Sequence, residues 1–265
     1  MGYTRPKITT NSSIHKVIGG RHPVVELFQM SRGNDFIIND SLLAQNSKIV
    51  LLTVELSTHF RTDSIIGPQH GRQVDLFKAK VRAVRLIYLV ISAIISIMAQ
   101  TGLYVPCLDA ELSIIDQIFT RIGSSDDLSA NQSTFMVEMK ETANILKNAT
   151  SNSLVIMDEV GRGTSTKDGI SLALSILDHL KTINKSMCIF ATHYHELCKM
   201  ISERDMKGIS FYQAACILDE NKRLTCLHKI VPGVMDRSHG IQIAEMAGLP
   251  TSVIRKAQTI HKSIG

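Results

Sequence analysis

The residues Leu154-Val155-Ile156-Met157-Asp158-Glu159 form a short apolar run that ends on two carboxylates. Four apolar residues in a row, bounded by polar ones, are typical of a buried strand in a parallel sheet. Because open α/β sheets bind ligands beyond the carboxyl ends of their strands, the two carboxylates stand where a ligand is expected. Asp158 can bind Mg²⁺, and Glu159 can orient or deprotonate a water molecule. The alternative is a strand that merely ends in solvated acids, and the Gly/Ser/Thr-rich residues 161–166 make that alternative weaker.

A nucleotide hydrolase pairs such a strand with a glycine-rich loop that ends in Gly-Lys-Ser/Thr and cradles the phosphates. The corresponding place contains Gly67, Pro68 and Gly71, but residues 72–75 supply no lysine, serine or threonine. These three residues are therefore candidates for phosphate binding in a damaged loop. We expect negligible ATPase activity from the chain as written.

Short apolar segments alternate with amphipathic ones, a pattern that predicts an α/β fold with a mostly parallel sheet flanked by helices. Turn residues between the segments predict where each element begins and ends. The predicted elements are strands at 49–53, 154–157 and 187–191, helices at 110–120, 134–148, 169–181 and 195–201, a hairpin at 211–218 and 224–231, and two C-terminal helices at 241–247 and 250–261.

The bulk composition excludes some classes of protein and leaves others open. The 265 residues carry a net charge of +5, but the basic residues are scattered, so charge alone does not indicate a nucleic-acid partner. The five cysteines form no C-x-x-C pair, which favours a reduced intracellular protein with structural thiols over a disulfide or zinc scaffold. The apolar run at 86–99 is shorter than the ~20 residues of a membrane helix, so a buried helix is favoured and no membrane partner is expected.

Two further residues have chemistry that their immediate surroundings leave open. His193 follows the predicted strand at 187–191, where it can reach a γ-phosphate or the attacking water, or can be structural. A metal site shared with His195 is disfavoured, because side chains at i and i+2 do not share a helix face. Ser133 directly precedes a predicted helix, where a hydroxyl serves as an N-cap or helps to bind a phosphate.

Together these segments resemble the ATPase domain of the MutS family of DNA mismatch-repair proteins. The resemblance covers most of the chain and rests on several long matches in the same order. These matches are residues 20–26, 36–40, 123–139, 157–169, 190–197, 238–244 and 247–250. The resemblance implies a P-loop NTPase fold of the ABC-ATPase type for residues 1–235. It also implies a C-terminal helix-turn-helix dimerisation region at 236–265, which we expect to be truncated.

The resemblance also implies roles for individual residues. It assigns Mg²⁺ and the hydrolytic water to the two strand-end carboxylates, and it places His193 near the γ-phosphate of ATP. Phe36 and His228 would pack on the adenine. Ser133 would reach the nucleotide of a second MutS-type subunit, so a complete site would require a homo- or heterodimer.

The implied function is to couple ATP binding and hydrolysis to clamp states on mismatched double-stranded DNA, which absent N-terminal domains would contact. Residues 37–40 and 98–107 look most like the fungal mitochondrial branch, so we expect a mitochondrial or, failing that, a nuclear location. Two other classes stay open. One is a pseudo-ATPase that serves as a nucleotide-independent dimerisation module. The other is an ABC-type transporter ATPase, whose L-S-G-G-Q signature residues 128–132 match only in part.

The damaged loop has a specific explanation in the genetic code. Relatives run from I-V-L-L-T directly into G-P-N-M-G-G-K-S-T-[YF]-L-R-Q-N, and a one-base frame shift of permitted codons for residues 67–80 encodes G-P-N-M-G-G-K-S-T-Y-L-R-Q. The unmatched segments 54–66 and 81–92 both begin with a valine codon, GT, and can end in AG, as introns do. The first segment would remove thirteen codons plus one base, and the second would remove eleven codons plus two bases. Together they remove 25 codons, so the frame is restored and a 240-residue product remains. We therefore interpret both segments as translated introns, 67–80 as an out-of-frame phosphate loop, and the run at 86–91 as intron rather than helix.

Overall fold

The structure is a computed structural model that describes residues 2–10, 13–53, 68–123, 134–218, 224–234, 240–246 and 248–264. Its elements alternate between strands and helices through most of the chain. In chain order they are β1 (Lys7–Thr9), β2 (His15–Gly20), α1 (Pro23–Met30), β3 (Asn39–Leu43), β4 (Ile49–Thr53), α2 (Pro68–Gln100), β5 (Asp109–Ser113), β6 (Ile118–Arg121), α3 (Thr134–Asn148), β7 (Leu154–Asp158), α4 (Thr166–His179), the π-helix η2 (Leu180–Asn184), β8 (Met187–Thr192), α5 (Glu196–Glu203), β9 (Ile209–Leu218), β10 (Leu224–Pro232), α6 (Gly240–Met246) and α7 (Thr251–Ile264).

A six-stranded sheet in the order β10-β9-β4-β8-β7-β6 forms the centre of the molecule. All neighbouring strands in it are parallel except the edge strand β10, which pairs antiparallel with β9. Every residue of β4, β7 and β8 is buried, which is why these strands are continuous apolar runs rather than alternating ones. The predicted α/β class with a mostly parallel sheet is therefore what the structure contains.

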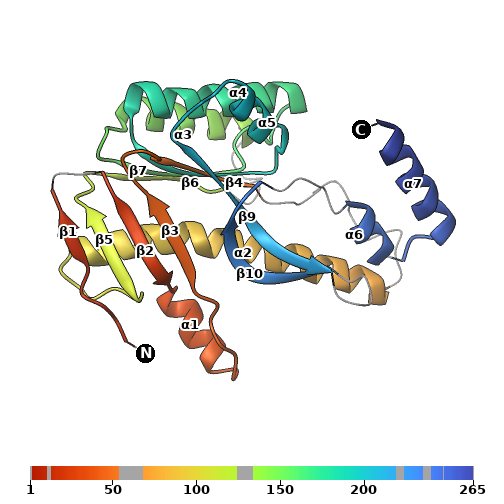
Figure 1. Cartoon of the computed structure of the whole chain (residues 1–265), viewed down its shortest axis with the longest axis horizontal. Coiled ribbons are helices and arrows are strands. Elements are labelled where there is room, and N and C mark those ends of the chain that lie inside the picture. The colour runs from red at the N-terminus through yellow and green to blue at the C-terminus, as the bar shows by residue number, and fades with distance from the viewer. Residues whose placement is uncertain are drawn as a thin grey trace.

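Helices cover both faces of this sheet. In Figure 1, α3, α4 and α5 lie on one side of the strands and the long helix α2 lies on the other. Each face has its own apolar cluster: one joins Leu174 of α4 to Phe190 of β8, and the other joins Tyr88 of α2 to Leu52 of β4. The sheet is therefore the middle layer of three, and its carboxyl edge lies between two helical layers.

A smaller four-stranded sheet, in the order β1-β5-β2-β3, packs beside the C-terminal half of α2. There Ile91, Ile95 and Ala99 of α2 meet Val17 of β2 and Leu112 of β5 in a third apolar cluster. Helix α2 thus joins the two sheets, since its middle packs under the large one and its end under the small one.

Helix α2 corrects one interpretation of the sequence. Residues 86–91 are helical and largely buried, with Tyr88 and Leu89 in the core, so the first expectation of a buried helix is right and the view that they form no helix is wrong for this chain. Within the described residues, Ala79–Gln100 is also long and apolar enough to span a membrane, but 56% of its most apolar window is buried in the protein. Burial against two sheets accounts for that apolar character.

The predicted helix at 110–120 is also wrong, because this interval contains strand β5 and the start of strand β6. In β5 the buried residues Ala110 and Leu112 alternate with the less buried Asp109 and Glu111, as in a strand with one face on the core. The other predicted strands, helices and hairpin are present with small shifts at their ends. The segments 54–66 and 124–133 lie outside the described residues.

Candidate functional site

The carboxyl edge of the large sheet brings together three of the predicted site residues. Asp158 is the last residue of β7, Glu159 follows it, and His193 follows the neighbouring strand β8. The register pairs Asp158 with Ala191, and the Glu159 N–H donates to the Ala191 carbonyl over 2.9 Å. Glu159 has a φ of +53°, a left-handed conformation that few non-glycine residues adopt. The parallel pairing and this sharp turn hold the two carboxylates at the strand end.

Residues around the following turn hold its backbone in place. The Gly161 N–H donates to Glu138 Oε1 over 2.5 Å, and the Tyr194 hydroxyl donates to the Gly161 carbonyl over 2.9 Å. Gly161 has a φ of +88°, and a Cβ there would lie 2.8 Å from Gly169 Cα, so only glycine fits. Glu138 and Tyr194 are thus positioning residues, and their roles were not apparent from sequence because they depend on contacts between separate elements.

A buried cation lies on the two carboxylates. Arg85 of α2 is only 2% exposed, and its Nε lies 3.0 Å from Asp158 Oδ1. Its Nη1 donates to Glu159 Oε1 over 2.5 Å. Arg162 Nη1 donates to the other oxygen, Glu159 Oε2, over 2.7 Å. Both oxygens of Glu159 are therefore paired with guanidinium groups, an arrangement that sequence analysis did not anticipate.

The charges at this edge follow from burial and from the two arginines. Burial raises the pKa of Asp158 to about 6, against the attraction of Arg85 and with a further upward contribution from Glu159. Burial also tends to raise the pKa of Glu159, but Arg85 and Arg162 together hold it below its usual value. Burial lowers the pKa of His193 even though Glu159 pulls in the opposite direction. His193 is therefore neutral at pH 7, and Glu159 is ionised, with one guanidinium hydrogen bond on each of its oxygens.

This arrangement does not fit Mg²⁺. The ion requires about six oxygen ligands at about 2.0–2.1 Å, whereas Asp158 Oδ1 and both oxygens of Glu159 already lie against the guanidinium groups of Arg85 and Arg162. Across the described residues, no group of three or more His, Cys, Asp or Glu side chains is placed to hold a metal ion. In this structure an arginine takes the position in which a metal cation was expected.

The predicted phosphate-binding residues do not form a loop where they are described. Pro68 and Gly71 lie in the first turn of α2, so their backbone is helical rather than wrapped into a phosphate cradle. Gly67 and Ser133 lie outside the described residues. ATP therefore lacks the cradle that its phosphates would need from residues 68–71.

The two residues expected at the adenine belong to segments that contact each other. Phe36 is partly buried and packs against the cluster between α2 and the small sheet. His228 has a φ of +56° and lies where the β9–β10 register shifts, and its carbonyl accepts a hydrogen bond from Asn39 Nδ2 over 3.1 Å. Asn39 Oδ1 in turn accepts from the Ile230 N–H over 2.7 Å. The segments at 36–39 and 228–230 are thus joined.

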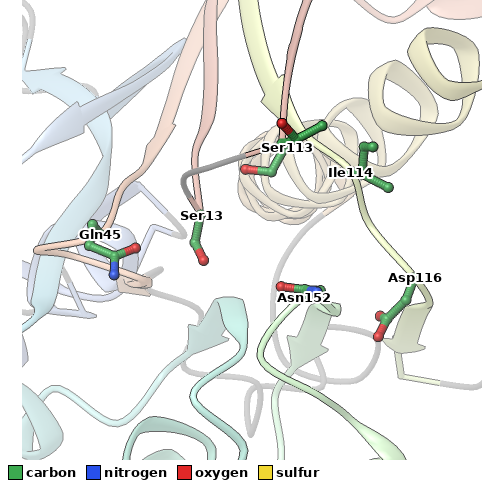
Figure 2. Close-up of a pocket in the computed structure, with 7 residues that line it drawn as sticks. Ser13, Gln45, Ser113, Ile114, Asp116 and Asn152 are labelled. Carbon is green, nitrogen blue, oxygen red and sulfur yellow. The ribbon is translucent and has the colours of Figure 1, made fainter.

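A polar pocket of about 460 Å³ lies away from this site. Asn152 and Asp116 line it (Figure 2), and Asn152 precedes β7 whereas Asp158 ends it, so the pocket lies near the amino ends of the parallel strands. The Asp116 carboxylate accepts hydrogen bonds from the Ser153 hydroxyl over 2.7 Å and from the Thr150 hydroxyl. None of the predicted site residues lines this pocket, so it is separate from the carboxylate edge.

Comparison with known proteins gives a consistent family match. Residues 83–265 match the family described as MutS domain V, a range that excludes the predicted phosphate loop at 67–80. The chain is similar to the DNA mismatch repair protein MutS of Clostridium botulinum (strain Alaska E43 / Type E3), with 45% identity over 265 residues that cover 99% of this chain and 25% of that protein. It is also similar to the DNA mismatch repair protein MutS of Rickettsia typhi (strain ATCC VR-144 / Wilmington), with 41% identity over 258 residues that cover 97% of this chain and 26% of that protein.

The DNA mismatch repair protein MutS of Clostridium tetani (strain Massachusetts / E88) is 43% identical over 265 residues, which cover 99% of this chain and 27% of that protein. The chain thus spans about a quarter of the length of the curated relatives it matches. All three relatives are bacterial, so they give no support to the narrower resemblance to a fungal mitochondrial branch.

Proposed function

The chain belongs to the MutS family, and from this premise we propose that it is the ATPase-type domain of a DNA mismatch repair protein, catalytically silent as written. The match to MutS domain V, the parallel sheet and the strand-end carboxylates support the domain assignment. The proposed role of the domain in a complete protein is to couple ATP and Mg²⁺ binding to clamp states on mismatched DNA.

The observation that carries the silent state is the pairing of Arg85 with both carboxylates. A general base must accept a proton from water, and the guanidinium groups of Arg85 and Arg162 lower the pKa of Glu159 and so weaken it as a base. A divalent cation would have to displace a buried arginine, which would leave that charge without a partner in the core. The proposed silent state therefore lacks both an effective general base and a bound divalent cation.

Hydrolysis assays test this proposal directly. The chain as written should release no more phosphate from ATP in the presence of Mg²⁺ than its Glu159→Gln variant does. The positive comparator is the 240-residue product in which the two proposed introns are removed and the loop is in frame. That product should hydrolyse ATP and lose the activity when the equivalent glutamate is changed to glutamine. Hydrolysis by the 265-residue chain that disappears in Glu159→Gln would contradict the silent state.

The transcript tests the proposed origin of the silent state. We expect an mRNA that lacks the codons for 54–66 and 81–92 and joins the loop in frame. An mRNA that retains both segments would overturn the intron interpretation, while the family assignment would stand. The proposed mitochondrial or nuclear location is tested separately by imaging a tagged protein expressed from the native gene.

The partner assignments follow from the same family premise. We propose a second MutS-type subunit, whose nucleotide Ser133 would contact, and mismatched double-stranded DNA bound by other domains of a longer protein. Cross-linking through a photoreactive residue at position 133 would identify the subunit, since a contact across a dimer yields a covalent dimer rather than an internal link.

Nucleotide-independent dimerisation is a second candidate function, and the C-terminal helices favour it. Helix α7 lies away from the central sheet in Figure 1, and Val253 and Ile260 on it are 48% and 46% exposed. Changing both residues to glutamate should convert a dimer to a monomer in sedimentation velocity, with Arg255→Glu, an exposed position on the opposite side of α7, as the matched control. A monomeric unmodified chain would remove this candidate.

A further inference from the structure

Cys216 and Cys226 lie directly opposite each other in the antiparallel β9–β10 hairpin. Opposed residues of antiparallel strands have Cα atoms about 4.5 or 5.5 Å apart, depending on the type of pair. Both separations fall within the ~4.4–6.8 Å that a disulfide spans. The structure contains both residues as thiols, and the register places them at a Cα separation that a disulfide can span.

The surroundings of the pair favour a reactive thiolate. A hydrogen bond from Cys216 lowers the pKa of Cys226 to about 7, against burial, which raises it. A backbone hydrogen bond at His228 and the positive charge of Lys80 add to the lowering. A thiolate is the nucleophile of thiol–disulfide exchange, and it is most effective when its pKa lies near the ambient pH.

The other three cysteines lack this combination. Burial raises the pKa of Cys107 to about 11 and that of Cys198 to about 12, and it also raises the pKa of Cys188. Cys226 is buried like these three, but its partner Cys216 is partly exposed and so can meet a small oxidant. Opposed register, a reactive thiolate and access therefore coincide at the hairpin.

We propose that Cys216 and Cys226 form a thiol–disulfide modification site that is oxidised by a small disulfide of the glutathione class. The thiolate of the pair attacks one sulfur of glutathione disulfide and expels a glutathione thiolate. The second cysteine, as its thiolate, then attacks the mixed disulfide, forms the Cys216–Cys226 bond and expels a second glutathione thiolate. Two electrons pass from the two cysteines to glutathione disulfide, and the two cysteine protons pass through solvent to the two glutathione thiolates.

The disulfide would link β9 to β10 next to the interval in which their pairing is irregular in the reduced chain. The register of the hairpin shifts between Cys226 and Ile230, and His228 lies in this interval with its left-handed backbone. Cys226 also belongs to the apolar cluster that contains Phe77 and Val81 of α2. A cross-link should therefore reduce local opening of β10 beside the contact between Asn39 and His228.

Peptide mapping of the full chain tests the proposal. The protein is held in glutathione buffers with an increasing oxidised share, alkylated, and digested with trypsin. Trypsin cuts after Lys207, Lys222, Arg223 and Lys229, so residues 208–222 and 224–229 become separate peptides with one cysteine each. We expect these two peptides to appear linked, two hydrogens lighter than their sum, before any other cysteine is oxidised. Dithiothreitol should separate them.

Matched variants and an exchange measurement complete the test. Cys198→Ser should leave the link unchanged, and Cys216→Ser should abolish it and leave Cys226 as a mixed disulfide with glutathione. Amide exchange in 224–231 should slow on oxidation of the unmodified chain but not of Cys216→Ser. The proposal is overturned if Cys216 and Cys226 are still reduced, and therefore alkylated, when other cysteines have been oxidised. It is also overturned if each of the two ends as a stable mixed disulfide with glutathione, or if either forms its main disulfide with another cysteine.

Discussion

Arg85 determines the chemistry of the two carboxylates that the sequence places at the end of β7. The guanidinium is a fixed cation with several donors, so it can form ion pairs with Asp158 and Glu159 together from one position. In the proposed silent state, that pairing opposes both metal binding and the activation of water. A single arginine from a separate helix thus carries the proposal that this edge is a structural ion cluster.

Replacing this arginine tests the cluster. Arg85→Met should lower the free energy of unfolding by about 3–5 kcal/mol, because two buried carboxylates lose their partner. Arg82→Met, at an exposed position on the same helix, should cost less than about 1 kcal/mol. Adding Asp158→Asn and Glu159→Gln to Arg85→Met should recover part of the loss, because both buried carboxylate charges are removed. Urea unfolding measures all three, and equal stability of the two single variants would show that the pairing contributes little.

A buried histidine makes the stability of the small sheet depend on pH. His15 is fully buried in β2, with Nδ1 3.4 Å from Ser96 Oγ, and burial lowers its pKa to about 4 from the ordinary 6.5. The unfolded chain therefore binds a proton below pH 6.5 that the folded chain excludes until about pH 4. Stability falls as the pH drops through this window, and His15 should contribute a loss of about 2 kcal/mol between pH 7 and pH 5.

Denaturant titrations of variants at the two pH values measure this dependence. His15→Gln should show a smaller difference in unfolding free energy between pH 7 and pH 5 than the unmodified chain does. His261→Gln, which changes an exposed histidine on α7, should leave the difference unchanged. An identical pH dependence in His15→Gln would show that this residue is not the source.

At the scale of elements, the sequence supported two different interpretations of α2: a buried helix, and a translated intron with no helix at 86–91. Its apolar length predicts a buried helix, and the structure buries that length against two sheets. Translated intron residues obey the same physical chemistry as any others, so they fold wherever their apolar side chains can be buried. Residues 81–92 therefore pack as core in this chain, whatever their origin.

The contribution of this segment to the core can be measured at one buried and one exposed position. Leu89 is fully buried, so Leu89→Ala should lower the free energy of unfolding by about 2–5 kcal/mol through lost burial and a new cavity. Ile97, on the same helix, is 53% exposed, so Ile97→Ala should cost less than about 1 kcal/mol. Chemical denaturation of both variants decides the point, because equal effects would mean that residue 89 does not pack in the core.

Strand and helix prediction succeeded where a segment was continuously apolar or clearly amphipathic, and failed where a short segment alternated between buried and exposed residues. Strands β4, β7 and β8 are uninterrupted apolar runs, and helices α3, α4 and α5 have clear amphipathic spacing. The interval 110–120 contains only two short strands, and five residues such as Asp109–Ser113 contain too few repeats to distinguish a period of two from one of 3.6. Its strand state comes from pairing with β1 and β2.

At the scale of the whole molecule, the family and the three-layer arrangement explain how a nucleotide site could be built here. The carboxyl edge of the sheet presents Asp158, Glu159 and His193 together, and the segments of Phe36 and His228 are joined through Asn39. The strand-end residues are thus held together and the two adenine candidates belong to joined segments, and in the proposed nucleotide site a loop between β4 and the start of α2 would hold the phosphates. The described start of α2 is helical instead.

Ligand-induced stabilisation provides a test on the whole molecule. A ligand that binds only the folded state raises its stability, by about 2.7 kcal/mol when present at 100 times its dissociation constant. The chain as written should therefore show no rise in its thermal unfolding temperature on adding ATP with Mg²⁺. The 240-residue product with the loop in frame should show a clear rise under the same conditions. A rise for the 265-residue chain that persists with ATP in Glu159→Gln would indicate binding and contradict the expectation.

The sequence by itself determined the fold class, the family resemblance and the identity of the strand-end residues. These are local properties, since apolar runs, turn residues and matched motifs can be recognised within a few consecutive positions. Only the tertiary structure decided that Arg85, 74 positions from Glu159, neutralises the strand-end carboxylates, and that Cys216 faces Cys226. Both depend on how separate elements pack and on strand register. The free energy of those contacts arises from burial and charge pairing between residues that are distant in the chain or set opposite each other only by register.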